Sequence, residues 1–167
     1  MELMICIILS VIVIGGIMAY NNAQKQKLVS SGEAVDRSDD FYRKKHVFKT
    51  NVEDIEKIGE AIDKATLNKH SISFEPAYDN GMIVFHNKIE FGSFGAALRS
   101  EGKDEASGKY LYRFQVEAWR EKNGIRRQDL FGANILLTTI EKTIFSLDSE
   151  TSVERTRGDF HAKASWI

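Results

Sequence analysis

The chain has 167 residues, with 23 Lys and Arg against 24 Asp and Glu, one cysteine and one proline. This nearly neutral balance argues against a general nucleic-acid binder, which usually carries a clear basic excess. A single cysteine excludes a disulfide framework within the chain and argues against structural zinc held by thiolates. The length suggests about one folded domain.

Residues 3–20 form an uncharged apolar run, LMICIILSVIVIGGIMAY, which predicts a transmembrane helix. An α-helix of this length spans about 27 Å, close to the roughly 30 Å hydrocarbon core of a bilayer. A secretory signal peptide fits less well, because no Lys or Arg precedes the run and poor cleavage sequences follow it. We therefore expect residues 1–20 to be a membrane anchor, with the lipid bilayer as a partner through residues 3–20.

Charge on either side of the run predicts its orientation. Lys25, Lys27 and then Arg37 follow it, and no Lys or Arg precedes it. The positive-inside rule then places the C-terminal side in the cytoplasm. We expect a single-pass protein of the cell membrane with a cytoplasmic C-terminal domain.

Residues 21–40, NNAQKQKLVSSGEAVDRSDD, predict a juxtamembrane linker because they are polar and lack sustained apolar periodicity. A flexible linker of this length has a root-mean-square reach of about 25 Å. Alternatively, residues 23–29 continue the membrane helix by two turns before it ends. The two interpretations are compatible.

Residues 41–167 are expected to form the globular domain, beginning with a short strand over 43–50. The pattern Thr50-x-x-Glu53 predicts a capping box at the start of a helix. The helix is predicted over 52–67 by apolar residues at spacings of three and four: Val52, Ile55, Ile58, Ile62 and Ala65.

A β-hairpin is predicted next, with strands over 71–75 and 82–86. Asn80-Gly81 between these runs is a strong local hairpin signal. If Asn80 and Gly81 are the two loop residues, Glu75 faces His86 across the hairpin.

Extended chain follows over 88–99, with Gly92 and Gly95 predicting a bulge or bend. Residues 99–109 predict a loop, and residues 109–120 the clearest strand. Alternation of apolar and polar residues along that strand is typical of a half-solvated antiparallel sheet. Its predicted apolar face comprises Tyr110, Tyr112, Phe114, Val116 and Ala118, with Leu111 and Trp119 at the ends of the other face.

After a turn at Asn123-Gly124, a second helix is predicted over 127–147, and residues 152–156 predict a final edge strand. The order β-α-β-β(-β)-β-α-β predicts an α+β fold, a two-layer sandwich of two helices on a mostly antiparallel sheet. A ferredoxin-like core with an inserted strand and a cystatin-like curled sheet are both compatible with this order.

No motif in the sequence predicts a catalytic, cofactor-binding or metal-ligating residue. The four histidines, His46, His70, His86 and His161, lie in no H-x-x-x-H or H-E-x-x-H pattern, and the glycines match no phosphate-binding loop. The Glu75/His86 pair is the most concrete acid–base candidate, and a cross-strand structural pair is the favoured interpretation.

Two basic clusters are candidates for contact with anionic lipid. One covers residues 43–46, and the other contains Arg155, Arg157, His161 and Lys163. In a ferredoxin-like topology the first and last strands run near each other, so the clusters could merge; a solvated surface with interspersed acids is the favoured interpretation. The Trp166-Ile167 terminus is expected to dock on its own domain or on a partner.

The sequence therefore favours a non-enzymatic interaction or assembly module, tethered at the membrane surface with a protein partner there. Enzymatic activity stays open. The alternative is a small membrane-tethered enzyme or ligand-binding domain, with a pocket in a curled sheet lined by Tyr110, Tyr112 and Phe114. An internal pocket with polar groups would favour the alternative, and a solid core with an open sheet edge would favour assembly.

Overall fold

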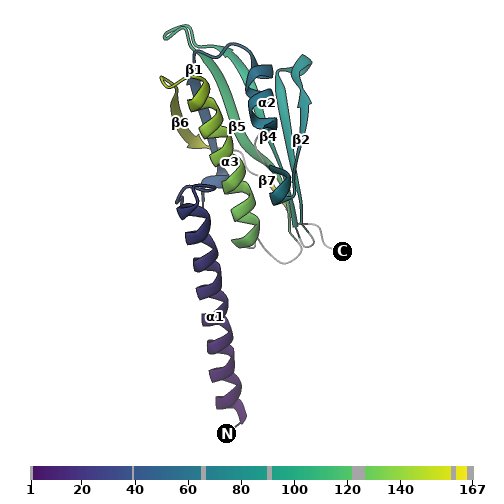
Figure 1. Cartoon of the computed structure of the whole chain (residues 1–167). Helices are drawn as coiled ribbons and strands as arrows, with labels where there is room; N and C mark the ends of the chain where they lie inside the picture. Colours follow the sequence, from purple (N-terminus) through teal and green to yellow (C-terminus); the bar gives the residue numbers. More distant parts are fainter. Residues whose placement is uncertain are drawn as a thin grey trace.

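A long N-terminal helix and a small α+β domain make up the protein (Figure 1). The computed structural model describes residues 2–38, 40–64, 67–89, 92–121, 127–158 and 161–164. Helix α1 (Glu2–Ser30) projects from the domain, in which α2 (Ile55–Asp63) and α3 (Arg127–Leu147) pack against a β-sheet. The predicted α+β class is confirmed.

Six strands form an open antiparallel sheet in the order β2-β3-β4-β5-β1-β6, and a seventh, β7, pairs in parallel with β5. Three short 3-10 helices connect the elements, at Phe41–Arg43, Leu67–His70 and Tyr78–Asn80. The strands are β1 (Lys44–Thr50), β2 (Ile72–Ala77), β3 (Met82–Ile89), β4 (Gly92–Lys103), β5 (Tyr110–Glu121), β6 (Ser152–Arg157) and β7 (His161–Ala164).

The first strand lies between β5 and the sixth strand, β6. Lys44 pairs with Arg157, and His46 pairs with Arg155. The basic cluster at the start of the domain and Arg155 and Arg157 of the second cluster therefore lie on neighbouring strands. Helix α3 connects β5 to β6 and returns the chain to the sheet beside β1.

Helix α2 begins later than predicted, and the capping-box prediction is wrong. Its N-cap is Asp54, whose carboxylate accepts the Glu56 N–H at 2.8 Å. Thr50 is instead the last residue of β1, and its hydroxyl donates to the Asp148 carboxylate at 2.9 Å. The β1 ladder extends through Thr50, so helix formation starts only at Ile55.

The β2–β3 hairpin has a longer loop than predicted. Residues Tyr78–Asn80 form a 3-10 turn, and Gly81 follows in the left-handed conformation with φ of 60°. Consequently Glu75 pairs with Val84, two positions from His86. The predicted register is wrong by two residues, but a shift of two keeps both side chains on the same face of the sheet.

A β-bulge changes the direction of side chains in β5. The register with β4 shifts between Gly95 and Ala96, which leaves Glu117 as the extra residue of β5. Alternation resumes one residue out of phase beyond a bulge. Trp119 is therefore buried and Ala118 exposed, the reverse of the prediction.

Strand β4 is also longer than predicted and continues to Lys103. The predicted 99–109 loop therefore begins only at Asp104. The predicted turn at Asn123-Gly124 and the Trp166-Ile167 terminus lie outside the described residues.

The core fills the space between one face of the sheet and helices α2 and α3. Tyr112 and Phe114, proposed from sequence as pocket-lining residues, are fully buried in it. Residues 132–138 of α3 are all buried, because the sheet covers one side of the helix and the segment after α1 covers another. The largest fully buried side chains include Trp119, Tyr112, Phe48, Phe85 and Phe114.

The described strand order ends at β2 on one side and β6 on the other. Pro76, the only proline of the chain, lies in β2. Strand β6 is short and carries exposed charged residues, Glu154, Arg155 and Arg157. Short, charged or proline-containing strands are common at natural sheet edges, where they limit pairing with other chains.

Candidate site at the helix–domain junction

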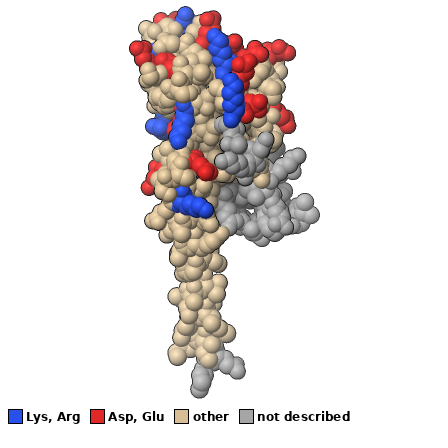
Figure 2. Space-filling view, viewed as in Figure 1, with Lys and Arg blue, Asp and Glu red and all other residues tan. Residues whose placement is uncertain are grey.

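The first part of α1 is an exposed apolar helix. Every side chain over residues 4–20 is exposed and none is charged, and Figure 2 shows this part of the helix free of Lys, Arg, Asp and Glu. Within Met4–Ser30, an 18-residue window has a mean hydropathy of 2.3 and contains no buried residue. An apolar surface of this extent is unusual on a soluble monomer, and the helix is compatible with a single-pass membrane anchor.

Helix α3 also has the length and composition of a membrane span, over Leu130–Leu147, with a mean hydropathy of 1.2. Its packing explains this composition. The helix lies against the sheet, and 44% of that window is buried. It is the core helix of the domain, whereas α1 has no such cover.

Helix α1 continues for ten residues beyond Tyr20 and ends at Ser30. The interpretation in which residues 23–29 continue the helix is therefore confirmed. Gly32 then adopts a left-handed conformation with φ of 73°, and its N–H donates to the Val29 carbonyl at 3.0 Å. Glycine is the usual residue at such a helix end, because it has no Cβ to clash.

Residues 31–38, here called the strap, follow the turn and lie along α3. Ala34 is 5% exposed. The Val35 N–H donates to the Thr138 hydroxyl at 3.2 Å, and its carbonyl accepts from the Asn134 amide at 2.9 Å. At the start of the strap, the Lys142 ammonium donates to the Gly32 carbonyl at 2.5 Å. The strap thus connects α1 to the core helix through several hydrogen bonds.

Arg37 makes the most extensive contact between the strap and α3. Its guanidinium donates to Asn134, to the Thr138 hydroxyl at 2.7 Å and to the Glu141 carboxylate. The Arg37 and Glu141 side chains are only 9% and 12% exposed. Burial lowers the pKa of Arg37, and the Glu141 carboxylate opposes this shift. The side chain stays charged, because the guanidinium pKa starts far above neutral pH.

A cavity of about 160 Å³ lies between α1 and the first turns of α3. It is bounded at one end by the residues that directly follow the apolar segment of α1. Two cations, Lys25 and Arg37, contribute to it, and none of its described lining residues is acidic. The lining residues are Asn21, Asn22, Lys25, Arg37, Phe41, Leu130, Phe131 and Asn134.

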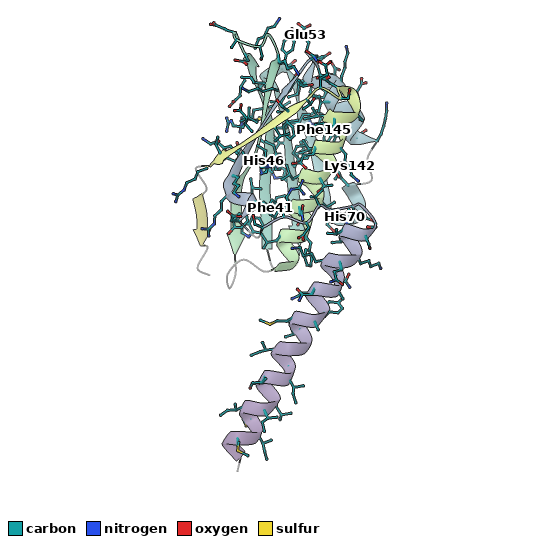
Figure 3. The ribbon with its side chains drawn as sticks, turned by 90° about the vertical axis from the view of Figure 1, so that its left-hand side faces the viewer. Phe41, His46, Glu53, His70, Lys142 and Phe145 are labelled. Atoms are coloured by element: carbon teal, nitrogen blue, oxygen red, sulfur yellow. The ribbon has the colours of Figure 1, made fainter. Side chains whose placement is uncertain are left out.

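A second cavity, of about 350 Å³, lies where the strap begins, between η2 (Leu67–His70) and α3. His70 Nε2 lies 3.1 Å from the Glu33 carboxylate there. In Figure 3, His70 and Lys142 lie near the turn that ends α1. Thr138, Thr139 and Thr143 of α3 complete the lining, together with the apolar residues Leu67 and Ile135.

His46 is buried beneath the start of the domain and is 1% exposed. Its Nε2 lies 3.3 Å from the Phe41 carbonyl, and Figure 3 labels both residues in the sheet domain above α1. Burial lowers the pKa of His46 to about 4, and the nearby cations Arg155, Arg37 and Lys44 add to the shift. A neutral, enclosed imidazole of this kind is a core residue at neutral pH.

The Glu75/His86 pair lies on the solvent-facing surface of the sheet. His86 Nε2 is 3.7 Å from the Glu75 carboxylate, and both side chains are exposed. The contact is therefore diagonal across the hairpin, an arrangement common in surface pairs. Among the described residues, no group of three or more His, Cys, Asp or Glu could hold a metal ion.

Sequence analysis missed the residues that join the strap to α3. The available signal was a polar stripe, Asn134, Thr138 and Glu141, at spacings of four and three along an otherwise apolar helix. Such a stripe indicates that a polar partner packs on that helix face. The identity of Arg37 as the partner depends on tertiary structure.

No protein-family model, curated protein or solved structure matches this chain. Inference about function therefore depends on the geometry of the junction.

Proposed function

We propose that this chain is a single-pass, membrane-anchored interaction or assembly module, without enzymatic activity of its own, that acts with a protein partner at the membrane surface. The observation that carries this proposal is the uncharged, fully exposed helix over residues 4–20, which is joined to the folded domain through the strap. Anchoring raises the effective concentration of a domain for partners in the same membrane.

The end of the apolar segment of α1 lies next to the folded domain, which supports a function of the domain close to the bilayer. Asn21 and Asn22, which follow Tyr20, share a cavity with Leu130 and Phe131 of α3. With residues 3–20 in hydrocarbon, the first turns of α3 would lie at the depth of the headgroups. The polar part of α1, residues 21–30, would rise about 15 Å beside the domain.

The charge distribution supports a cytoplasmic domain in a protein of the cell membrane. Lys25 and Lys27 follow the apolar segment, and both precede the strap. Positive residues concentrate on the cytoplasmic side of natural spans. For the domain itself, the ferredoxin-like alternative is supported by the adjacency of β1 and β6, and the cystatin-like alternative by the bulge at Glu117.

The solid core favours assembly over the alternative in which the sheet encloses a pocket. Tyr112 and Phe114 lie in the apolar core together with residues of α2 and α3. One observation favours a small-ligand-binding function instead. The cavity of about 350 Å³ beside His70 has the size of small-molecule sites, which occupy roughly 300–1,000 Å³.

Membrane anchoring is tested by fractionation of the full-length chain after an alkaline carbonate wash. We expect the protein in the membrane pellet and in solution only after detergent is added. Ile12→Arg, in the middle of the apolar segment, should shift the protein to the soluble or aggregated fraction. Gln26→Arg, which adds the same charge to an exposed position of α1 beyond Tyr20, should leave it in the pellet. Wild-type protein that is freely soluble would contradict the anchor.

The partner is tested by affinity capture of the detergent-solubilised, full-length chain with mass spectrometry. A stoichiometric membrane protein or membrane-associated protein would support the module. A tightly bound small molecule without such a protein would favour the ligand-binding alternative.

Orientation is tested by labelling Ser107→Cys in a Cys6→Ser background, because Ser107 lies in an exposed loop. An impermeant reagent should label it only in permeabilised cells. Labelling in intact cells would contradict the cytoplasmic orientation.

A further inference from the structure

We propose that the cavity between α1 and the first turns of α3 binds the phosphate of an anionic phospholipid headgroup. The inference rests on the membrane anchoring proposed above and assigns that anchor a specific lipid contact.

The position of the cavity fits a headgroup. Asn21 and Asn22 directly follow the apolar segment that ends at Tyr20, and Lys25 lies one helical turn beyond them. With residues 3–20 in hydrocarbon, these side chains reach the level of the lipid phosphates. The opposite wall, Leu130 and Phe131, is apolar and faces the same level.

The charges of the lining fit an anion. Lys25 and Arg37 both line the cavity, whereas their acidic partners, Asp36 and Glu141, do not. Arg37 is 9% exposed and held by three partners on α3, so its charge is fixed in place. Lys25 is 35% exposed, lies 2.7 Å from the Asp36 carboxylate and donates to the Arg37 carbonyl at 3.5 Å, so one of its three N–H donors remains for a phosphate oxygen.

Amide groups supply the remaining donors. Asn134 already accepts from Arg37 and donates to the Val35 carbonyl. Asn21 and Asn22 therefore provide the side-chain N–H groups that a phosphate would accept from. Cation and amide donors together are the usual recognition chemistry for phosphate.

The size of the cavity is also suitable. Its volume of about 160 Å³ equals roughly five water molecules at about 30 Å³ each, and a phosphate group has five heavy atoms. A neighbouring hollow of about 340 Å³ on another side of Lys25 includes Asp36. That hollow lacks the net positive lining, so the anion is assigned to the smaller cavity.

The test uses the full-length protein in detergent micelles that contain phosphatidylglycerol, phosphatidylcholine or diacylglycerol with the same acyl chains. Native mass spectrometry then counts the lipids that the protein retains. We expect phosphatidylglycerol to be retained best. Phosphatidylcholine should be weaker because its choline cation offsets the phosphate charge, and diacylglycerol should not be retained.

Two matched variants locate the site. Lys25→Gln should weaken phosphatidylglycerol retention by about fivefold, the equivalent of the roughly 1 kcal/mol that one basic residue contributes near an anionic surface. Lys27→Gln removes the same charge from the same helix but lies outside the cavity. It should change retention by less than about twofold.

Three outcomes would overturn the proposal. They are equal retention by the two variants, retention of diacylglycerol at the level of phosphatidylglycerol, and displacement of the lipid by millimolar inorganic phosphate. The last outcome would mean that the cavity takes a soluble phosphate. Each is distinguishable from failure of the membrane anchor, because carbonate-resistant membrane association of the wild-type chain would persist.

Discussion

The side-chain amide of Asn134 donates to the backbone carbonyl of Val35 at 2.9 Å, while the Val35 N–H donates to Thr138, one turn further along α3. Both backbone groups of one strap residue are thus satisfied by side chains of the core helix. These two hydrogen bonds fix the position of the strap on α3. This arrangement makes the junction testable by single substitutions.

Arg37→Ala should loosen the strap. It leaves the Glu141 carboxylate, which is 12% exposed, with only the surface residue Arg155 as a charged partner among the described residues. Removal of one member of a buried ion pair costs about 3–5 kcal/mol. We expect faster hydrogen exchange at the amides of residues 31–38, measured on the detergent-solubilised chain.

The matched control for Arg37→Ala is the double variant Arg37→Met with Glu141→Leu. It removes both charges and should restore slow exchange, since apolar replacement of a buried pair is often neutral or stabilising. If the hydrogen-exchange rates of residues 31–38 were unchanged in Arg37→Ala, the other strap contacts would be sufficient to hold the strap on α3.

Acid should destabilise the domain through His46. Its pKa falls from 6.5 in the unfolded chain to about 4 in the folded domain, so between these values the unfolded state binds more protons. Stability is therefore complete above pH 6.5 and decreases as the pH falls towards 4, by roughly 3 kcal/mol in total. Urea unfolding at a series of pH values measures this slope.

Replacement of the imidazole tests the assignment of this slope. His46→Phe should reduce the slope between pH 6.5 and 4, whereas His86→Gln, on the exposed face of the sheet, should retain the contribution of His46. The same slope in wild type and His46→Phe would place the acid sensitivity elsewhere.

Tyr112→Phe should destabilise the contact between the sheet and the start of α2. The Tyr112 hydroxyl lies 3.0 Å from the Val52 carbonyl and 2.7 Å from the Glu53 carbonyl. Burial raises the pKa of Tyr112 to about 12, so the hydroxyl remains a donor at neutral pH. Loss of these bonds should lower the free energy of unfolding by about 1–3 kcal/mol. In contrast, Tyr110→Phe, two residues away and more exposed, should lower the free energy of unfolding by less. Equal losses in the two variants would contradict the stabilising role of the Tyr112 hydroxyl.

Gly158→Ala should disturb the connection between β6 and β7. The Gly158 N–H donates to the Arg43 carbonyl at 2.8 Å, and a Cβ atom at this position would lie 2.9 Å from that oxygen. Overpacking against backbone typically costs about 1–3 kcal/mol. Gly95→Ala is the control, because a Cβ there meets only ordinary contacts at 3.8 Å. Thermal unfolding should therefore separate the two variants.

Sequence periodicity predicted the elements that carry a strong local pattern. Helix α3, strand β5 and the apolar helix α1 were found because their apolar residues repeat at the helical or strand period over many residues. The predicted start of α2 was wrong because Thr50-x-x-Glu53 resembles a capping box. In the structure Thr50 belongs to β1, and its hydroxyl donates to Asp148.

The other errors depend on contacts that local patterns do not encode. The hairpin register depends on the 3-10 turn before Gly81, and the reversal at Trp119 depends on one extra residue, Glu117, opposite β4. Arg37 and its partners on α3 are about a hundred residues apart in sequence. A polar loop without periodicity gives no signal for contacts of this range.

The placement of Pro76 has a consequence for a protein confined to two dimensions. Proline occurs in sheets almost only at edge strands, where its missing N–H faces solvent, and Pro76 lies in the outermost strand β2. Crowding on a bilayer would otherwise favour edge-to-edge strand pairing between neighbouring copies, which would form a continuous fibre. One sheet edge, β2, is interrupted by Pro76, and the other, β6, is short and charged. Clusters of this chain on a membrane are therefore expected to contain a limited number of copies.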